Sequence, residues 1–115
     1  MRVGKNTQLF TFAQQNYTFL MKTDYQNEII NKVRLLRQSK NISQAKLAAI
    51  IGVSTGQIGN IETPTRAHKY TLSQLSIVCD ELGIPLENIF IDNVTMLSKD
   101  EIVKRLINSI IEYEK

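Results

Sequence analysis

Residues Ile42 to Glu62 read ISQAKLAAIIGVSTGQIGNIE, and this stretch decides the fold. Its pattern predicts two short helices joined by a tight turn. Ser43 can cap the first helix, because its hydroxyl can accept a hydrogen bond from a backbone N–H of the first turn. Gly52 suits the end of that helix, since glycine adopts a positive φ without steric cost. Ser54 follows two residues later and can cap the second helix.

The predicted second helix, residues 54–62, has an apolar inner face and an unusual outer face. Ile58 and Ile61 lie three residues apart and would point inward. The outer positions are uncharged and either small or hydrogen-bonding: Thr55, Gly56, Gln57, Gly59 and Asn60. A helix face that meets only solvent usually carries charged residues. We therefore expect this face to approach another surface closely.

The segments SQAKLAAIIGVS and QIGNIE resemble the helix-turn-helix of the lambda-repressor-like (Cro-type, Xre family) DNA-binding proteins. The resemblance extends from about Glu28 to Ile91. It implies an all-α fold, with a five-helix lambda-repressor-like DNA-binding domain over residues 25–91. An N-terminal arm, residues 1–24, would precede this domain, and a connector with an extra C-terminal helix, residues 92–115, would follow it. In such proteins the second helix of the motif lies in the major groove of DNA, and the first crosses the backbone.

The resemblance also implies which residues contact DNA. Gln44 matches a position at which the side chain and the helix N-terminus hold a phosphate. Thr55, Gly56, Gln57 and Asn60 match the groove-facing positions, whereas Ser54 fits a cap better than a contact. Gln and Asn side chains can each bind an adenine edge through two hydrogen bonds. The glycines would let the helix backbone come close to the DNA.

Arg37 matches a family position whose arginine pairs with the glutamate that closes the second helix of the motif. That glutamate is Glu62 here. The resemblance thus implies a structural ion pair between Arg37 and Glu62. A phosphate contact by Arg37 is the alternative.

After Glu62 the sequence departs from the short asparagine-glycine connection of the family and reads TPTRAHKY over residues 63–70. Pro64 disfavours the α conformation at the preceding residue, so the second helix should end near Glu62. Arg66 and Lys69 follow the helix, and we expect them to contact phosphates beside the groove. The alternative is a solvated loop.

Charge is unevenly distributed along the chain. Residues 1–70 contain ten Lys and Arg and three acidic residues, whereas residues 71–115 contain four Lys and Arg and eight acidic residues. The net charges of the two parts are therefore +7 and −4. A basic segment that includes a candidate reading helix is typical of a protein that binds a polyanion. A solvated surface with a chance bias is the alternative.

Composition narrows the function classes. The 115 residues suit one domain with appendages, and 43% are hydrophobic, which is enough for a core. No apolar run approaches the roughly 18 residues of a membrane helix. The single Cys79 excludes an internal disulfide, suits a buried position and favours a reducing cytoplasm. With one histidine and no ligand cluster or catalytic motif, we expect no metal, no cofactor and no enzymatic activity.

The segments beside the motif are less distinctive. Residues 9–12 and 17–20 alternate apolar residues with threonine, so the arm is either a small β-hairpin or unstructured. A helix capped by Asp24 is predicted to residue 39. Thr71 and Gly83 bound a further predicted helix over residues 72–82, and a short helical turn should begin at Pro85.

A last helix should run from Ser98, which forms a capping box with Glu101, to about residue 114. Four of its apolar residues recur with a three-four-three step close to that of a coiled coil: Val103, Leu106, Ile110 and Tyr113. We expect this row to form a homodimer interface, and packing on the core or the arm is the alternative. Pairing matters because one reading helix covers only a few base pairs, and a two-fold dimer places two such helices about one DNA turn, ~34 Å, apart.

Together these patterns predict sequence-specific binding of double-stranded DNA by a repressor-like transcriptional regulator. The alternative is a protein-interaction or antitoxin-like module that keeps the fold but binds DNA weakly or not at all. The two glycines of the second helix favour that alternative, because each lowers helix stability by ~1 kcal/mol relative to alanine.

Overall fold

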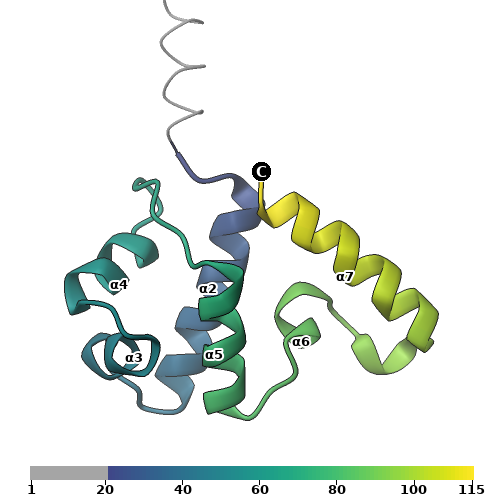
Figure 1. Ribbon diagram of the computed structural model, residues 1–115, viewed down its shortest axis with the longest axis horizontal. Coiled ribbons are helices and arrows are strands. Elements are labelled where there is room, and N and C mark those ends of the chain that lie inside the picture. Colours follow the sequence, from purple (N-terminus) through teal and green to yellow (C-terminus); the bar gives the residue numbers. More distant parts are fainter. Residues whose placement is uncertain (1–20) are drawn as a thin grey trace, which may run out of the picture.

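The computed structural model describes residues 21–115, and in this part of the chain the regular secondary structure is helical (Figure 1). The elements are α2 (Asp24–Ser39), α3 (Gln44–Ile51), α4 (Thr55–Glu62), α5 (Leu72–Leu82), α6 (Glu87–Phe90), the 3₁₀ turn η1 (Val94–Met96) and α7 (Lys99–Tyr113). The predicted all-α fold is confirmed. Residues 9–20, for which the sequence leaves a small hairpin or an unstructured arm open, lie outside the described residues.

The two helices of the motif begin and end as the sequence predicts. The Ser43 hydroxyl accepts a hydrogen bond from the Lys46 amide at 3.0 Å, and the Ser54 hydroxyl accepts one from the Gln57 amide at 3.1 Å. Gly52 has a φ of +77°, in the left-handed region that ends α3. The turn between the helices is therefore fixed by local chemistry.

Other helix ends follow the same chemistry, with two corrections. Thr23, not Asp24, caps α2, because Gln26 lies three residues after Thr23 and completes a reciprocal capping box. The helix α6 begins at Glu87 rather than at Pro85. The Asn88 and Ile89 amides bond to the carbonyls three residues back, so the chain turns tightly before α6 begins.

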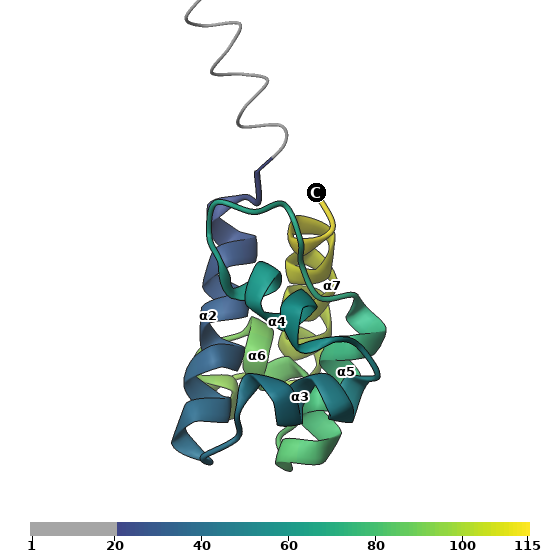
Figure 2. The same ribbon diagram turned by 90° about the vertical axis from the view of Figure 1, so that its left-hand side faces the viewer.

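The core lies where α3 and α4 pack against α2 and α5 (Figure 2). Its largest fully buried side chains come from every one of these helices and from the loop before α5, and they include Ile29, Val33, Leu47, Ile58, Ile61, Tyr70, Leu75 and Val78. Ala48 is 2% exposed on α3, where its small side chain permits the close packing of neighbouring helices. The outer face of α4 is left on the surface of the molecule.

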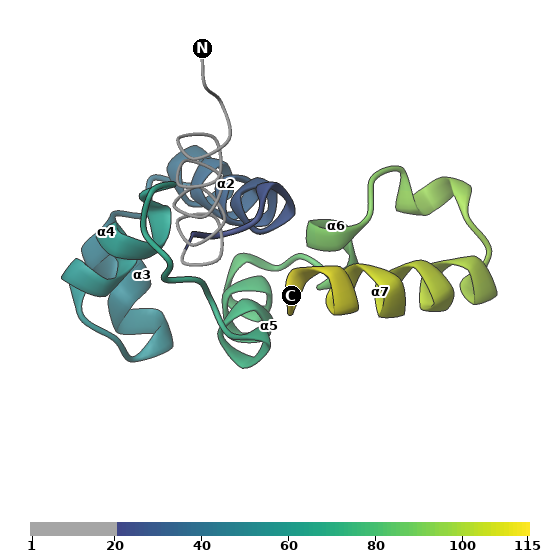
Figure 3. The same cartoon turned by 90° about the horizontal axis from the view of Figure 1, so that it is seen from above.

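Helix α7 is attached to this core by its C-terminal end. Tyr113 is fully buried, its hydroxyl donates to the Tyr70 carbonyl at 2.7 Å, and its ring meets that of Phe90 edge-on with the centroids 5.8 Å apart. The buried Gln26 side chain donates to the Tyr113 carbonyl at 2.7 Å. From this anchor α7 extends away from α2 and α5 (Figure 3). The deepest attachment of the C-terminal helix is therefore at its C-terminal end, while Ile102, Leu106 and Ile110 also pack against the core along its length.

The predicted dimer row on α7 needs a correction. Tyr113 lies inside the molecule, and Leu106 and Ile110 are half-buried against the core, so these three residues share the inward face. Val103 points outward with 55% of its surface exposed, next to Ile107 and Ile111, which are 53% and 56% exposed. Two apolar rows run along this helix. The packing of Tyr113 decides which of them faces the core.

Candidate nucleic-acid interface

The outer face of α4 is exposed to solvent, while the inner face of the helix is buried in the core. Ile58 and Ile61 are fully buried, and Ile61 lies one residue before Glu62, the last residue of the helix. The predicted groove-facing positions lie on the opposite side. Ser54, Thr55, Gly56 and Gln57 are exposed, and Asn60 is partly buried. Figure 2 looks onto this side of the molecule, with α3 and α4 toward the viewer.

The two glycines of α4 are not required by the packing of this protein. A Cβ built on Gly56 would have the Ser54 hydroxyl as its nearest neighbour, at 3.9 Å, and a Cβ on Gly59 would lie 3.8 Å from the Gln44 side chain. Both distances are ordinary van der Waals contacts, and neither glycine has a positive φ. Because alanine would fit and would favour the helix, the glycines suit a ligand that must approach the α4 backbone.

A buried ion pair joins the end of α4 to α2 and α3. The Arg37 guanidinium donates to both carboxylate oxygens of Glu62, at 2.7 and 2.6 Å, and to the Ile42 carbonyl at 3.0 Å. The two side chains are only 9% and 5% exposed. Such a two-bond arrangement fixes orientation as well as distance. The pairing that the resemblance implied is thus present in the structure.

The same carboxylate accepts a hydrogen bond from Gln44. The Gln44 amide donates to Glu62 at 2.9 Å, so its side chain turns toward the interior. In this arrangement the amide completes the network around Glu62, and the phosphate contact expected of Gln44 stays a prediction. Sequence spacing placed Gln44 at the start of α3 correctly, but it could not show that Glu62 lies within reach.

Burial alone would raise the pKa of the Glu62 carboxyl. Hydrogen bonds from Arg37 and Gln44, together with the positive charges of Arg37 and Arg34, outweigh that effect and hold this pKa below its ordinary value. The hydrogen bonds and charge of Glu62 in turn raise the pKa of Arg37. Both groups are therefore ionised at neutral pH, as a pair.

The loop after α4 is held by a residue that the sequence analysis did not single out. Lys22 is 6% exposed, and its ammonium donates to the carbonyls of Ile61, Thr63, Arg66 and His68 at 2.7–3.0 Å. The folded body therefore includes Lys22, earlier in the chain than the predicted boundary at residue 25. No sequence signal could have revealed these contacts, because they join residues 39 to 46 positions apart.

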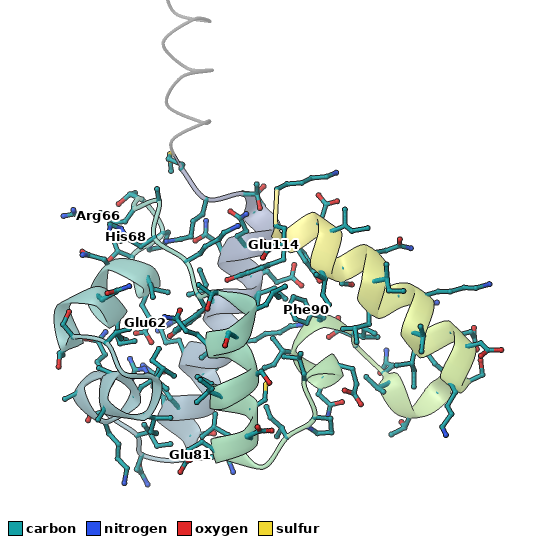
Figure 4. The ribbon with its side chains drawn as sticks, in the orientation of Figure 1. Glu62, Arg66, His68, Glu81, Phe90 and Glu114 are labelled. Carbon is teal, nitrogen blue, oxygen red and sulfur yellow. The ribbon has the colours of Figure 1, made fainter. Side chains whose placement is uncertain are left out.

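The Arg, His and Lys side chains of this loop differ in what they contact. Arg66 and His68 are exposed and extend from the loop beside α4 (Figure 4). Lys69 instead donates to the Tyr113 carbonyl at 3.0 Å, and its ammonium lies 5.1 Å from the centre of the Tyr113 ring. Lys69 thus stabilises the C-terminus of α7. Its expected phosphate contact stays a prediction, and Arg66 is exposed on the surface of the loop.

Two other kinds of feature, a metal-ligand group and a membrane-spanning helix, are not found in residues 21–115. This part of the chain contains no group of three or more His, Cys, Asp or Glu residues that could hold a metal ion. None of its helices combines the length and the apolar character needed to cross a membrane. Cys79 is 2% exposed, and burial raises its pKa to about 11, so its thiol is protonated in the core at neutral pH.

Comparison with known proteins agrees with this geometry. Residues 33–88 match a protein family described as helix-turn-helix, a segment that runs from within α2 into α6. No curated protein and no solved structure matches the chain. The segment that matches contains α3, α4 and the Arg37–Glu62 pair.

Glu62→Gln should lower the free energy of unfolding by about 3 kcal/mol at pH 7, because it leaves the Arg37 charge buried without its partner. Since the pKa of Glu62 is lowered by folding, its contribution is complete above the ordinary value of 4.5 and is lost as the pH falls through the folded value. The difference between wild type and variant should therefore shrink below pH ~4.5. Urea unfolding at a series of pH values measures it.

Glu112→Gln is the matched control, because Glu112 pairs with Lys115 at 3.2 Å on the exposed surface of α7. This variant should unfold like the wild type at every pH. A difference between wild type and Glu62→Gln that stays constant from pH 7 to pH 3 would contradict the assigned role of the ionised pair.

Proposed function

Through residues 33–88 the chain belongs to the helix-turn-helix family, and we propose that it binds double-stranded DNA sequence-specifically as a repressor-like transcriptional regulator. The observation that carries this proposal is the outer face of α4, which is uncharged, low in bulk and fixed by a buried ion pair at its end. We place the activity in the cytoplasm, the reducing compartment that the lone, buried Cys79 favours.

In the proposed complex α4 enters the major groove. Gln57 and Asn60 read base edges, since each amide can donate to and accept from adenine. Thr55 offers a methyl group to thymine or a hydroxyl to a phosphate. Arg66 meets the backbone beside the groove, where a phosphate contact adds affinity without sequence preference. Gly56 lets the α4 backbone approach the bases.

A protein-interaction module, antitoxin-like in type, is the second candidate. Two observations favour it. Both Gln44 and Lys69 turn toward other parts of the protein rather than outward, which leaves fewer candidate phosphate contacts near α4. The α4 face also lacks charge, and a partner protein could pack against it. Binding to duplex DNA separates the two candidates.

Asn60→Ala should weaken binding to the best duplex site by about 1–3 kcal/mol and relax the preference at one base pair, because a base contact is lost. Arg66→Ala should weaken binding to all sequences about equally and reduce the slope of log affinity against log salt by about 0.9, because one phosphate contact is lost. Titrations of a selected site and of random duplex at several salt concentrations measure both effects.

Wild-type binding that does not change with salt, or no duplex binding at ~50 mM salt, would favour the protein-interaction candidate. Equal losses on the selected and the random duplex would show that Asn60 does not read a base.

Gly56→Ala should separate stability from binding. The new methyl group fits beside Ser54 and favours the helix, so the free energy of unfolding should rise by roughly 0.5–1 kcal/mol. The same methyl group would lie between the α4 backbone and the DNA, so affinity for the selected duplex should fall. Urea unfolding and duplex titration on one preparation test both halves. A more stable variant with unchanged affinity would contradict close approach at this position.

We further propose a homodimer, with its interface on the outward face of α7. Val103, Ile107 and Ile111 recur every four residues there, and each is more than half exposed. Residues four apart form a ridge that packs against the same ridge of a second helix, so the contact can be isologous. Two copies of α4 would then read half-sites separated by one DNA turn or a multiple of it.

Ile107→Asp should yield a folded monomer with weaker binding to the selected duplex, because it places an unpaired charge within the proposed interface. Ile77→Asp is the matched control, since Ile77 is an exposed isoleucine on α5, 42% exposed, away from the row. Ile110→Asp should instead destabilise the fold, because Ile110 packs on the core. Light scattering and circular dichroism test these outcomes, and a wild type that is monomeric at tens of micromolar would exclude the dimer.

A further inference from the structure

The loop between α4 and α5 is shaped around the single ammonium group of Lys22. The carbonyl oxygens of Arg66 and His68 lie 2.7 and 2.8 Å from its nitrogen, and those of Ile61 and Thr63 each lie 3.0 Å away. The four carbonyls come from the last turn of α4 and from the loop that follows. One side chain from the segment before α2 therefore binds backbone carbonyls spread over eight residues, 61–68.

The loop has few other bonds to hold this shape. Within residues 63–68, the Arg66 amide donates to the Thr63 carbonyl at 3.1 Å, the Thr63 amide donates to the Asn60 carbonyl at 3.3 Å, and the Thr63 hydroxyl donates to the Gly59 carbonyl at 2.7 Å. All three bonds are local, between residues three or four apart. The contacts with Lys22 are the ones that tie the loop to the segment preceding α2.

A cation suits this position for an electrostatic reason. Four carbonyl oxygens that point at one place bring together the negative ends of four dipoles, which repel each other unless a positive group lies between them. An ammonium supplies a charge and three N–H donors, so one N–H is shared between two of the four carbonyls. Hydrogen bonds to a charged group are stronger than neutral ones. An uncharged side chain of the same length would leave the carbonyls facing one another.

We propose that Lys22 is a positioning residue for DNA binding, whose ammonium holds the loop so that Arg66 lies beside the outer face of α4. This inference rests on the proposed function of α4. Arg66 is exposed, and its own carbonyl is one of the four that bind Lys22, so the ammonium fixes the backbone from which the guanidinium extends (Figure 4). Lys22 itself, 6% exposed, is not available to a phosphate.

Lys22→Met tests the proposal, because methionine has a similar length and no charge. With the carbonyls released, the loop should open and Arg66 should no longer meet its phosphate at a fixed place. Affinity for duplex DNA should fall roughly five- to tenfold at low salt, and the slope against log salt should fall by about 0.9. Lys104→Met is the matched control, since Lys104 is exposed on α7 and its loss removes the same charge far from the loop.

A double variant distinguishes positioning from a general loss of stability. If Lys22 acts through Arg66, then Lys22→Met should weaken DNA binding little further in a chain that already carries Arg66→Ala. Independent, additive losses in this cycle would overturn the proposal. Circular dichroism confirms that each variant is folded. Where Lys22→Met does not fold, Lys22→Gln, which keeps two N–H donors, takes its place in the cycle.

A second measurement reports the loop without DNA. Trypsin cleaves after Arg66, and the rate of that cleavage rises when the loop opens. Lys22→Met should therefore be cut after Arg66 at least several times faster than wild type or Lys104→Met. Mass spectrometry identifies the fragment. Equal cleavage rates would show that the ammonium does not hold the loop.

Restoring the charge chemically completes the test. In a Lys22→Cys, Cys79→Ala chain, alkylation with bromoethylamine rebuilds an ammonium of lysine length at position 22, whereas an ethyl group rebuilds only the apolar stem. The aminoethyl form alone should recover slow cleavage and wild-type DNA affinity. Recovery by both forms would show that packing, not charge, positions the loop. A wild type that binds no duplex DNA would instead contradict the proposed function. The cleavage measurement uses no DNA, so it would still test whether Lys22 holds the loop.

Discussion

The carboxylate of Glu62 is the point on which the arrangement of the helix-turn-helix depends. It receives Arg37 from α2 and Gln44 from the start of α3, while its own backbone forms the last turn of α4. Three helices are thereby joined at one buried charge. An ion pair that is only 9% and 5% exposed carries a desolvation cost, so its main effect is to specify orientation. The outer face of α4 is presented at the angle that this junction sets.

The loop that follows α4, residues 63–70, has a comparable role and begins directly after Glu62. Its backbone carbonyls bind Lys22 at one end, and at the other end Lys69 and Tyr70 contact Tyr113 of α7. The candidate DNA-binding surface and the C-terminal helix are thus connected through eight residues. A dimer formed by α7 would set the positions of the two α4 helices through this same connection. Although the loop is long, its contacts at both ends hold it in place.

Helix α4 shows how a candidate binding surface can conflict with the stability of the fold. Two glycines weaken a helix of eight residues although the protein has room for alanine at both positions. The anchors on its inner face, Ile58 and Ile61, are fully buried and compensate for that weakness by packing. Because packing of the inner face holds such a helix in place, its outer face can carry small side chains. Small side chains are what close contact with a ligand requires.

The sequence by itself determined the features that depend on neighbours along the chain. Ser43, Gly52 and Ser54 fixed the ends of α3 and α4, and Pro64 ended α4, because caps and backbone preferences act over a few residues. The Arg37–Glu62 pair was predictable through the resemblance of its segment to a known motif. Tertiary structure alone decided that Lys22 binds the loop and that Gln44 and Lys69 turn inward, because those partners are 18 to 46 residues away. It also decided which row of α7 is exposed, since two apolar rows have the same helical period and only the burial of Tyr113 selects between them.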